Sequence, residues 1–161
     1  MVSFRLFLDG GFLLGVDRPN CDPPTSTYNY TLTGVPTWVN FTSSRLCTLV
    51  SSSIQASPFL MVSWPNASVA GCESYLAVAQ KLSDALGSSL KLVVFESASP
   101  LFVDPVENYI QIREPYGSIP ENNATLVYTT ISAKTANIIR SSTLGNITIT
   151  SGETPILSGW H

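Results

Sequence analysis

The sequence predicts an all-β fold, a sandwich or barrel built from about eight strands. Runs of Val, Ile, Leu, Thr, Tyr and Phe recur along the 161 residues and are separated by clusters of Pro, Gly, Asn and Ser. Eleven prolines force frequent exits from any strand ladder, because proline fixes φ and lacks a backbone donor. The predicted strands are Ser3–Leu8, Tyr28–Thr33, Arg45–Gln55, Phe59–Trp64, Leu90–Glu96, Tyr109–Arg113, Thr125–Lys134 and Asn146–Thr150.

The face of each strand is predicted from a period of two residues. Ile110 and Ile112 alternate with polar residues, and so do Ile147 and Ile149, which indicates one buried and one polar face for each of these strands. The apolar run Val93–Phe95 does not alternate. We therefore expect its strand to be central and covered on both faces.

One segment, residues 69–86, has the period of an amphipathic helix. Its apolar residues recur every three or four positions, Gly87 supplies a stop, and Asn66 or Ser68 is the expected N-cap. A single helix inserted between two strands is expected to lie across one end of the sandwich. The apolar positions are Val69, Cys72, Leu76, Ala79, Leu82 and Leu86.

The chain is expected to form one domain over residues 1–161, with residues 1–27 as an amino-terminal extension or arm. The apolar start, Met1–Val16, is interrupted by Asp9, Gly10 and Gly11 and is followed by no Ala-x-Ala cleavage signal. We interpret it as mature sequence. No run approaches the ~18 apolar residues of a membrane span.

The charge balance excludes two classes of partner. Eight Lys and Arg against eleven Asp and Glu give a net charge of −3, which argues against an autonomous nucleic-acid binder and against electrostatic docking on an anionic membrane. Only 12% of the residues are charged, about half the usual share of roughly 25%. We therefore expect much of the surface to be covered by something else.

No catalytic residue, cofactor site or metal site is predicted. The chain has one histidine, the terminal His161, no Gly-x-Ser-x-Gly motif and no phosphate-binding glycine loop. A pair of carboxylates of the glycosidase kind remains open, but scattered acidic residues are more simply solvated surface residues. These acids are Glu73, Asp84, Glu96, Asp104, Glu107, Glu114 and Glu121.

The three cysteines, Cys21, Cys47 and Cys72, include no Cys-x-x-Cys pair, which makes zinc binding very improbable. We interpret them as small buried hydrophobic residues. One disulfide with one free thiol is the alternative.

Five Asn-x-Ser/Thr sequons occur, and they matter only in a secretory compartment. Asn40 and Asn146 lie within or beside predicted strands, where a glycan would interrupt pairing, so we interpret the sequons as coincidental. Their asparagines are Asn29, Asn40, Asn66, Asn123 and Asn146.

Among the three tryptophans, Trp64 follows an apolar run and is expected to pack in the core or at the end of a strand. Trp38 and Trp160 are the candidates for contact with a partner, that is, the predicted interface residues.

The order of elements from Arg45 to Leu157 resembles the coat protein of tymovirus-like icosahedral plant viruses. The resemblance consists of the strand Leu46–Gln55, a second strand ending in Ser63-Trp64-Pro65, a polar turn leading to a helix, and the strand Lys91–Phe95. It continues through Ser99-Pro100-Leu101, Leu126-Val127-Tyr128 and Ile147–Gly152, and ends in Pro155-Ile156-Leu157. It implies an eight-stranded antiparallel jelly-roll sandwich with one inserted helix.

The leading functional hypothesis is a structural, non-enzymatic subunit of a small icosahedral virus capsid, located in the virion. Low charge suits extensive contacts with copies of itself or with other capsid proteins, because unpaired ions are costly to bury. Contact with viral RNA would be weak or indirect, and no membrane partner is expected. The alternative is a secreted carbohydrate-binding β-sandwich, favoured by the sequons and tryptophans. A hydrolase using paired carboxylates is a third possibility.

Overall fold

The protein has an α/β architecture in a computed structural model that describes residues 2–8, 12–16, 31–97, 117–121, 124–141 and 145–153. In chain order the strands and helices are β1 (Val2–Leu8), β2 (Phe12–Val16), β3 (Thr31–Gly34), β4 (Phe59–Ser63), α1 (Trp64–Val69), α2 (Tyr75–Leu86), β5 (Leu92–Glu96), β6 (Gly117–Glu121), β7 (Ala124–Ile131), α4 (Ala133–Ser141) and β8 (Ile147–Glu153). Short 3-10 turns occupy Ser51–Ser53 and Gly87–Ser89.

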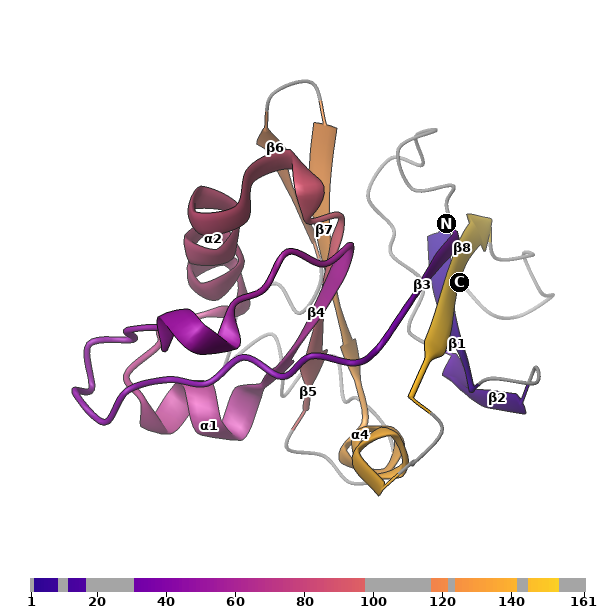
Figure 1. The fold of residues 1–161 in the computed structure, drawn as a ribbon, viewed down its shortest axis with the longest axis horizontal. Coiled ribbons are helices and arrows are strands. Elements are labelled where there is room, and N and C mark those ends of the chain that lie inside the picture. The colour runs from indigo at the N-terminus through magenta and orange to yellow at the C-terminus, as the bar shows by residue number, and fades with distance from the viewer. Residues whose placement is uncertain are drawn as a thin grey trace, which may run out of the picture.

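The strands form two separate sheets of four (Figure 1). In the mixed sheet, with strand order β4-β5-β7-β6, the first three strands are parallel and β6 runs antiparallel to β7. In the antiparallel sheet the order is β2-β1-β8-β3. The chain enters the mixed sheet after β3 and leaves it through α4 and β8.

The predicted antiparallel jelly roll with one inserted helix is therefore wrong. Parallel neighbours cannot be joined by a tight hairpin and need a crossover, and here α1 and α2 provide the crossover from β4 to β5. The sequence feature that indicates parallel strands is a pair of continuous apolar runs, Phe59–Val62 and Leu92–Phe95. Such runs are typical of parallel strands covered on both faces, and all five residues of both β4 and β5 are buried.

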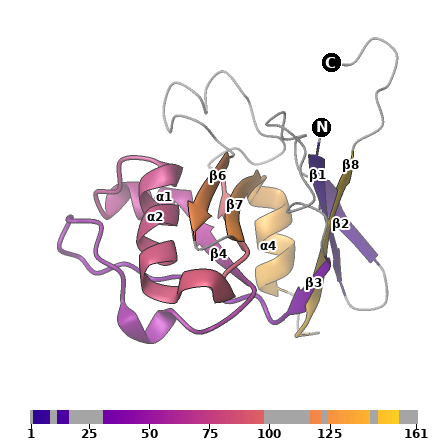
Figure 2. The ribbon, with the colours of Figure 1, turned by 90° about the horizontal axis from the view of Figure 1, so that it is seen from above.

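Alternate residues of β4 and β5 enter two different cores, one on each face of the mixed sheet. Leu60 and Val93 pack under α1 and α2. Met61 and Val94 pack on the opposite face, against α4 and against Ile147 and Ile149 of the antiparallel sheet. Figures 1 and 2 show the layers this produces, with α1 and α2 on one side of the mixed sheet and with α4 and the antiparallel sheet on the other.

A column of aromatic rings joins the helices to the mixed sheet. The ring of Tyr75 stacks on that of Phe95 with centroids 3.9 Å apart, and Trp64 meets Tyr75 edge-on at 5.2 Å. Tyr128 packs edge-on against Phe95, with the ring centroids 6.2 Å apart. Trp64 is 8% exposed, so its predicted place in the core is confirmed.

The single helix predicted over residues 69–86 is two helices. Residues 75–86 are helical as expected, and Gly87 ends α2 with a φ of 63°. The caps differ from the expected ones, because the hydroxyl of Ser63 accepts from the backbone N–H of Asn66 and that of Ser74 accepts from Ala77. Residues 70–74 leave the helical path, and Cys72 in this break is joined to Cys47.

Other predicted elements also need correction. The range 45–55 contains an isolated bridge at Leu49 and a 3-10 turn instead of a strand. The predicted strand over residues 125–134 runs into α4, and neither β2 nor β6 was predicted. Residues 2–8 and 12–16 of the supposed arm belong to the antiparallel sheet. The predicted strand Tyr109–Arg113 lies outside the described residues.

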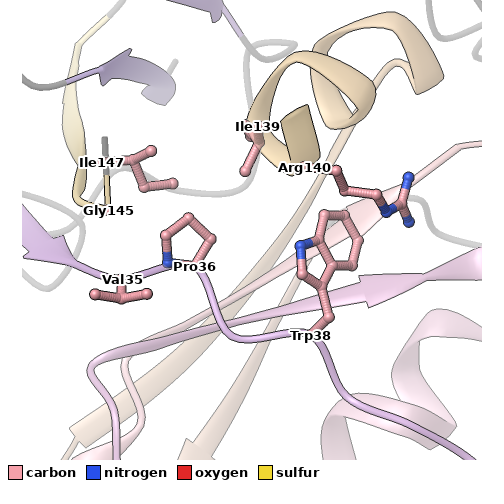
Figure 3. Close-up of a pocket in the computed structure, with 7 residues that line it drawn as sticks. All are labelled: Val35, Pro36, Trp38, Ile139, Arg140, Gly145 and Ile147. Carbon is pink, nitrogen blue, oxygen red and sulfur yellow. The ribbon is translucent and has the colours of Figure 1, made fainter. Parts of the chain in front are cut away.

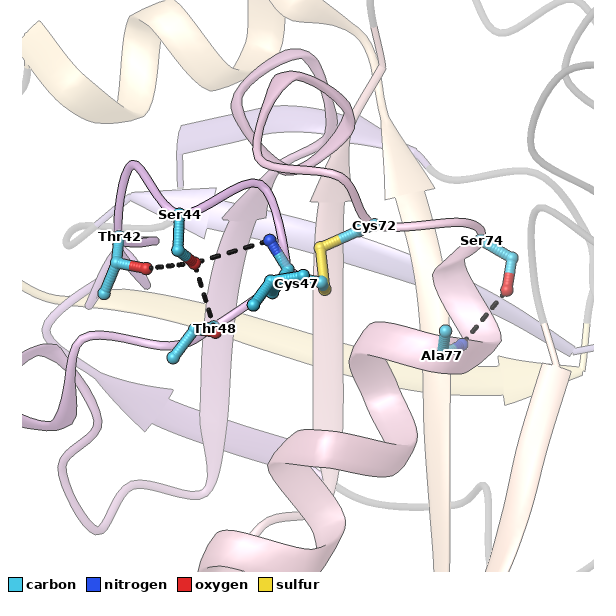
Figure 4. Close-up of a disulfide and its surroundings, with 8 residues drawn as sticks. Thr42, Ser44, Cys47, Thr48, Cys72, Ser74 and Ala77 are labelled. Carbon is cyan, nitrogen blue, oxygen red and sulfur yellow. Dashed lines mark hydrogen bonds between the residues drawn. A yellow bond between two sulfur atoms is a disulfide. The ribbon is translucent and has the colours of Figure 1, made fainter.

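A disulfide between Cys47 and Cys72 ties the loop of residues 41–49 to the end of α1 (Figure 4). The backbone N–H of Cys47 also donates to the carbonyl of Ala70 at 2.9 Å. Inside the loop, the hydroxyl of Ser44 bonds those of Thr42 and Thr48. Our interpretation of Cys47 and Cys72 as unbonded hydrophobic residues was therefore wrong, and Cys21 lies outside the described residues.

We expect the change Gly71→Ala to destabilise the fold strongly. A Cβ at residue 71 would lie 2.1 Å from the carbonyl oxygen of Arg45, and its φ of +92° is unfavourable for alanine. Left-handed strain of about 1–2 kcal/mol and overpacking of about 1–3 kcal/mol together predict a loss near 3 kcal/mol in a urea titration. Gly145→Ala is the control, because its φ is +82° but its Cβ meets nothing within 4 Å. Equal losses for the two variants would contradict the steric explanation.

Loss of the disulfide is expected to lower the free energy of unfolding. The bond links residues 25 apart in sequence, for which chain entropy predicts about 3–4 kcal/mol. The double variant Cys47→Ala/Cys72→Ala should show this loss in oxidising buffer. Addition of dithiothreitol should shift the denaturation midpoint of the wild type toward that of the double variant and leave the midpoint of the variant unchanged.

Candidate functional site

A pocket of about 290 Å³ lies where the chain passes between the two sheets. Val35 and Pro36 follow β3 on the way into the mixed sheet, and Gly145 and Ile147 lie on the way from α4 into β8. Trp38 and two residues of α4, Ile139 and Arg140, close the remaining sides (Figure 3).

Trp38 is held by the edge of the mixed sheet. The backbone N–H of Met61 donates to the carbonyl of Thr37, and the N–H of Val39 donates to that of Met61, both at 2.9 Å. This parallel bridge places Trp38 beside β4. Its half-buried side chain packs on the core shared with α4, while that of Val39 enters the core under α1 and α2.

Arg140, which packs against the ring of Trp38, forms a bidentate ion pair with Glu96. Glu96 is the last residue of β5 and only 6% of its surface is exposed. Its two carboxylate oxygens accept from the two terminal guanidinium nitrogens of Arg140 at 2.5 and 2.7 Å. A carboxylate this deeply buried needs such a partner, because burying an unpaired charge is costly.

The guanidinium of Arg140 also lies over the indole ring of Trp38, with its central carbon 3.9 Å from the ring centroid. The hydrogen bond to Glu96 raises the pKa of Arg140 above its ordinary value; partial burial opposes the rise, and the charge of Glu96 adds to it. Arg140 therefore stays charged and fixes the orientation of the indole.

Apolar and polar atoms contribute equally to the lining of the space that remains. Val35, Pro36, Ile139 and Ile147 supply hydrocarbon walls. In Figure 3 the guanidinium of Arg140 extends away from Pro36 and Ile139, whereas the nitrogen of Trp38 lies at the edge of the ring turned toward them. Within the described part of the chain this indole N–H has no hydrogen-bond acceptor. The pocket thus offers hydrocarbon walls beside polar groups that include the indole N–H donor, and the described residues that line it carry no unpaired charge.

Of the two predicted interface residues, Trp38 lies in this pocket and Trp160 lies outside the described residues. Our interpretation of the acids as solvated is wrong for Glu96, which is buried and ion-paired, and it holds for Glu73 and Asp84, which are exposed. The side chain of Glu121 and all of Asp104, Glu107 and Glu114 lie outside the described part.

Arg140 is the residue that sequence reasoning missed. It belongs to α4, whose start was interpreted as the continuation of a strand. Two signals were present, the hydroxyl of Ser132, which caps the helix by accepting from the N–H of Thr135 at 3.2 Å, and the spacing of buried Ala136 and Ile139. The pairing with Glu96 across 44 positions leaves no local pattern.

The described residues contain no group of three or more His, Cys, Asp or Glu side chains placed to hold a metal ion. Among the described helices, none combines the length and the apolar character that a membrane span requires.

Comparisons with protein-family models, with curated proteins and with solved structures found no match for this chain.

The ion pair predicts an asymmetric effect of mutation on the free energy of unfolding. Arg140→Met leaves a buried carboxylate unpaired and should cost about 3 kcal/mol, at the low end of the range for broken buried pairs, because the arginine side chain is 37% exposed. Glu96→Gln leaves a cation that can reach water and should cost less. The double variant Glu96→Met/Arg140→Met should recover most of the loss. A double variant as unstable as Arg140→Met, measured by urea denaturation, would contradict this account.

Proposed function

We propose that the chain is a non-catalytic ligand-binding domain of an oxidising, secretory compartment, and that the Trp38 pocket takes one ring of a neutral carbohydrate. This is the second of our two main functional hypotheses, placed on a different fold. The pocket is the single observation that carries it.

The position and size of the pocket support binding of a small molecule. Small-molecule sites occur at interfaces between units of structure and measure about 300–1,000 Å³, so a pocket of about 290 Å³ suits one ring or a short chain. The parallel bridge and the ion pair hold Trp38 in place. Such preorganisation lowers the entropy cost of binding.

The lining favours a neutral ligand with one apolar face. A pyranose presents C–H groups on its ring faces and oxygen acceptors at its edge. The hydrocarbon walls suit the first feature, and the indole N–H of Trp38 suits the second. Among the described residues that line the pocket, an ionic ligand would find no free counter-charge, because the guanidinium of Arg140 is already neutralised by Glu96.

The Cys47–Cys72 disulfide supports the proposal that the protein works in an oxidising, secretory compartment. Structural disulfides persist in secreted and other oxidised proteins and are rare in the cytosol.

The capsid hypothesis combined a jelly-roll resemblance with the low charge of the chain, and the parallel strands β4, β5 and β7 remove the first of these two supports. The capsid function and the virion location stay untested predictions. Light scattering of the purified protein separates them from the ligand-binding proposal, which needs no particle.

The ligand proposal predicts a selective change at one indole group. In protein labelled with ¹⁵N-tryptophan, the change Trp38→Phe identifies the Trp38 indole signal by its loss. Titration of the wild type with neutral mono- and disaccharides at millimolar concentration should move that signal in a saturable way and leave the signal of buried Trp64 unchanged.

A matched pair of exposed valines supplies the control. Val35 lines the pocket and is 60% exposed, whereas Val69 lies on α1 and is 79% exposed. Val35→Glu should weaken the response at least tenfold by placing a charge against the hydrocarbon walls of the pocket, and Val69→Glu should not change it. A Trp38 signal that none of the sugars moves, or equal binding by the two variants, would overturn the proposal.

A further inference from the structure

The structure changes the interpretation of the sequons. The described residues include three of the five sequon asparagines, Asn40, Asn66 and Asn146, and all three are exposed. Asn40, expected within or beside a strand, lies outside the described strands, next to the isolated bridge at Phe41. Its backbone N–H donates to the hydroxyl of Ser53 at 2.9 Å and its carbonyl accepts from Val50 at 2.8 Å, so the side chain stays outside this pairing.

Asn40 and Asn66 line one open hollow of about 580 Å³ on the side of α1 and the disulfide loop. Phe41, Arg45 and Val69 line the same hollow. Neither asparagine amide has a hydrogen-bond partner in the described part of the chain. Within the described residues the side-chain amide nitrogens of Asn40 and Asn66 are therefore available for attachment of a glycan, and the two sequons share one surface.

Two exposed apolar side chains are Val69, which lines the hollow, and Leu46, which follows the lining residue Arg45 in the sequence. Val69 is 79% exposed and Leu46 is 75% exposed. Val69 follows Asn66 by three positions on α1, which places both on the same helix face. The N–H of Cys47 donates a hydrogen bond to the carbonyl of Ala70. Leu46 precedes Cys47 and Val69 precedes Ala70, so this bond brings the backbones next to the two apolar side chains together. Contiguous exposed apolar patches on a monomer mark surfaces that another group covers, whereas single exposed apolar side chains are ordinary.

We propose that Asn40 and Asn66 carry N-linked glycans whose first sugars occupy this hollow and cover Leu46 and Val69. Each side-chain amide nitrogen forms the bond to the sugar and loses one proton, and the lipid-linked oligosaccharide of the secretory pathway supplies the glycan and releases its lipid pyrophosphate. The disulfide places the loop in the same oxidising compartment. Two bulky hydrophilic chains would also help to solvate a protein in which only 12% of all residues are charged.

Peptide-level mass spectrometry tests occupancy. Protein from its native source, treated with an amidase that converts glycosylated asparagine to aspartate in heavy-oxygen water, should carry the label at both residue 40 and residue 66. Unlabelled asparagine at either position would overturn the proposal for that site. This outcome would leave the Trp38 pocket untouched, because sugar binding there is measured on unglycosylated protein.

Pairs of variants at residues 42 and 68, secreted from eukaryotic cells, distinguish the loss of a sequon from the loss of side-chain contacts. One variant of each pair removes the sequon and the other keeps it. Thr42→Ala and Ser68→Ala should each remove one glycan from the intact mass. Thr42→Ser and Ser68→Thr keep the sequons, and Thr42→Ser keeps the hydroxyl that bonds Ser44. Retention of the full glycan mass in the alanine variants would contradict the assignment.

A separate measurement, self-association in light scattering, tests whether the glycans cover Leu46 and Val69. The variant Asn40→Gln/Asn66→Gln should self-associate in light scattering at concentrations where the glycosylated protein is monomeric. Adding Leu46→Ser and Val69→Thr should restore the monomer. Self-association that the two added changes do not reverse, or its absence in the glutamine variant, would overturn the covering role.

Discussion

Burial of two adjacent strands on both faces is the constraint from which the other features follow. All residues of β4 and β5 are buried, so each face of the mixed sheet must be covered by other elements. The α1–α2 crossover covers one face, while α4 and the antiparallel sheet cover the other. The chain must therefore cross between the sheets, and the two crossings that line the candidate pocket lie side by side.

The same constraint accounts for the charged pair behind the pocket. Glu96 ends a strand that is buried throughout, so its carboxylate cannot reach bulk water and requires the guanidinium of Arg140. That guanidinium then packs on Trp38. The ion pair that neutralises Glu96 thus also fixes the indole of Trp38, which lines the pocket. This arrangement connects the stability of the mixed sheet to the proposed binding of a sugar ring.

The low charge of the chain allows a second explanation besides the one that composition suggested. We expected neighbouring subunits to cover the surface, because few ionised groups are available to solvate it. The exposed asparagines beside Leu46 and Val69 allow glycans to perform the same task on an isolated molecule. Both explanations start from the same observation, and the disulfide and the α/β fold favour the second.

Local patterns in the sequence determined the approximate residue ranges of β4 and β5, the central place of Val93–Phe95, the buried face of β8 and the end of α2 at Gly87. Period and stop residues act within a few positions. Tertiary structure alone decided whether strands run parallel or antiparallel, since one apolar run suits either pairing. It also decided the Cys47–Cys72 bond, the break between α1 and α2, and the meeting of Glu96, Arg140 and Trp38. These contacts join residues 25 or more positions apart, a separation at which neighbours in sequence carry no information about neighbours in space.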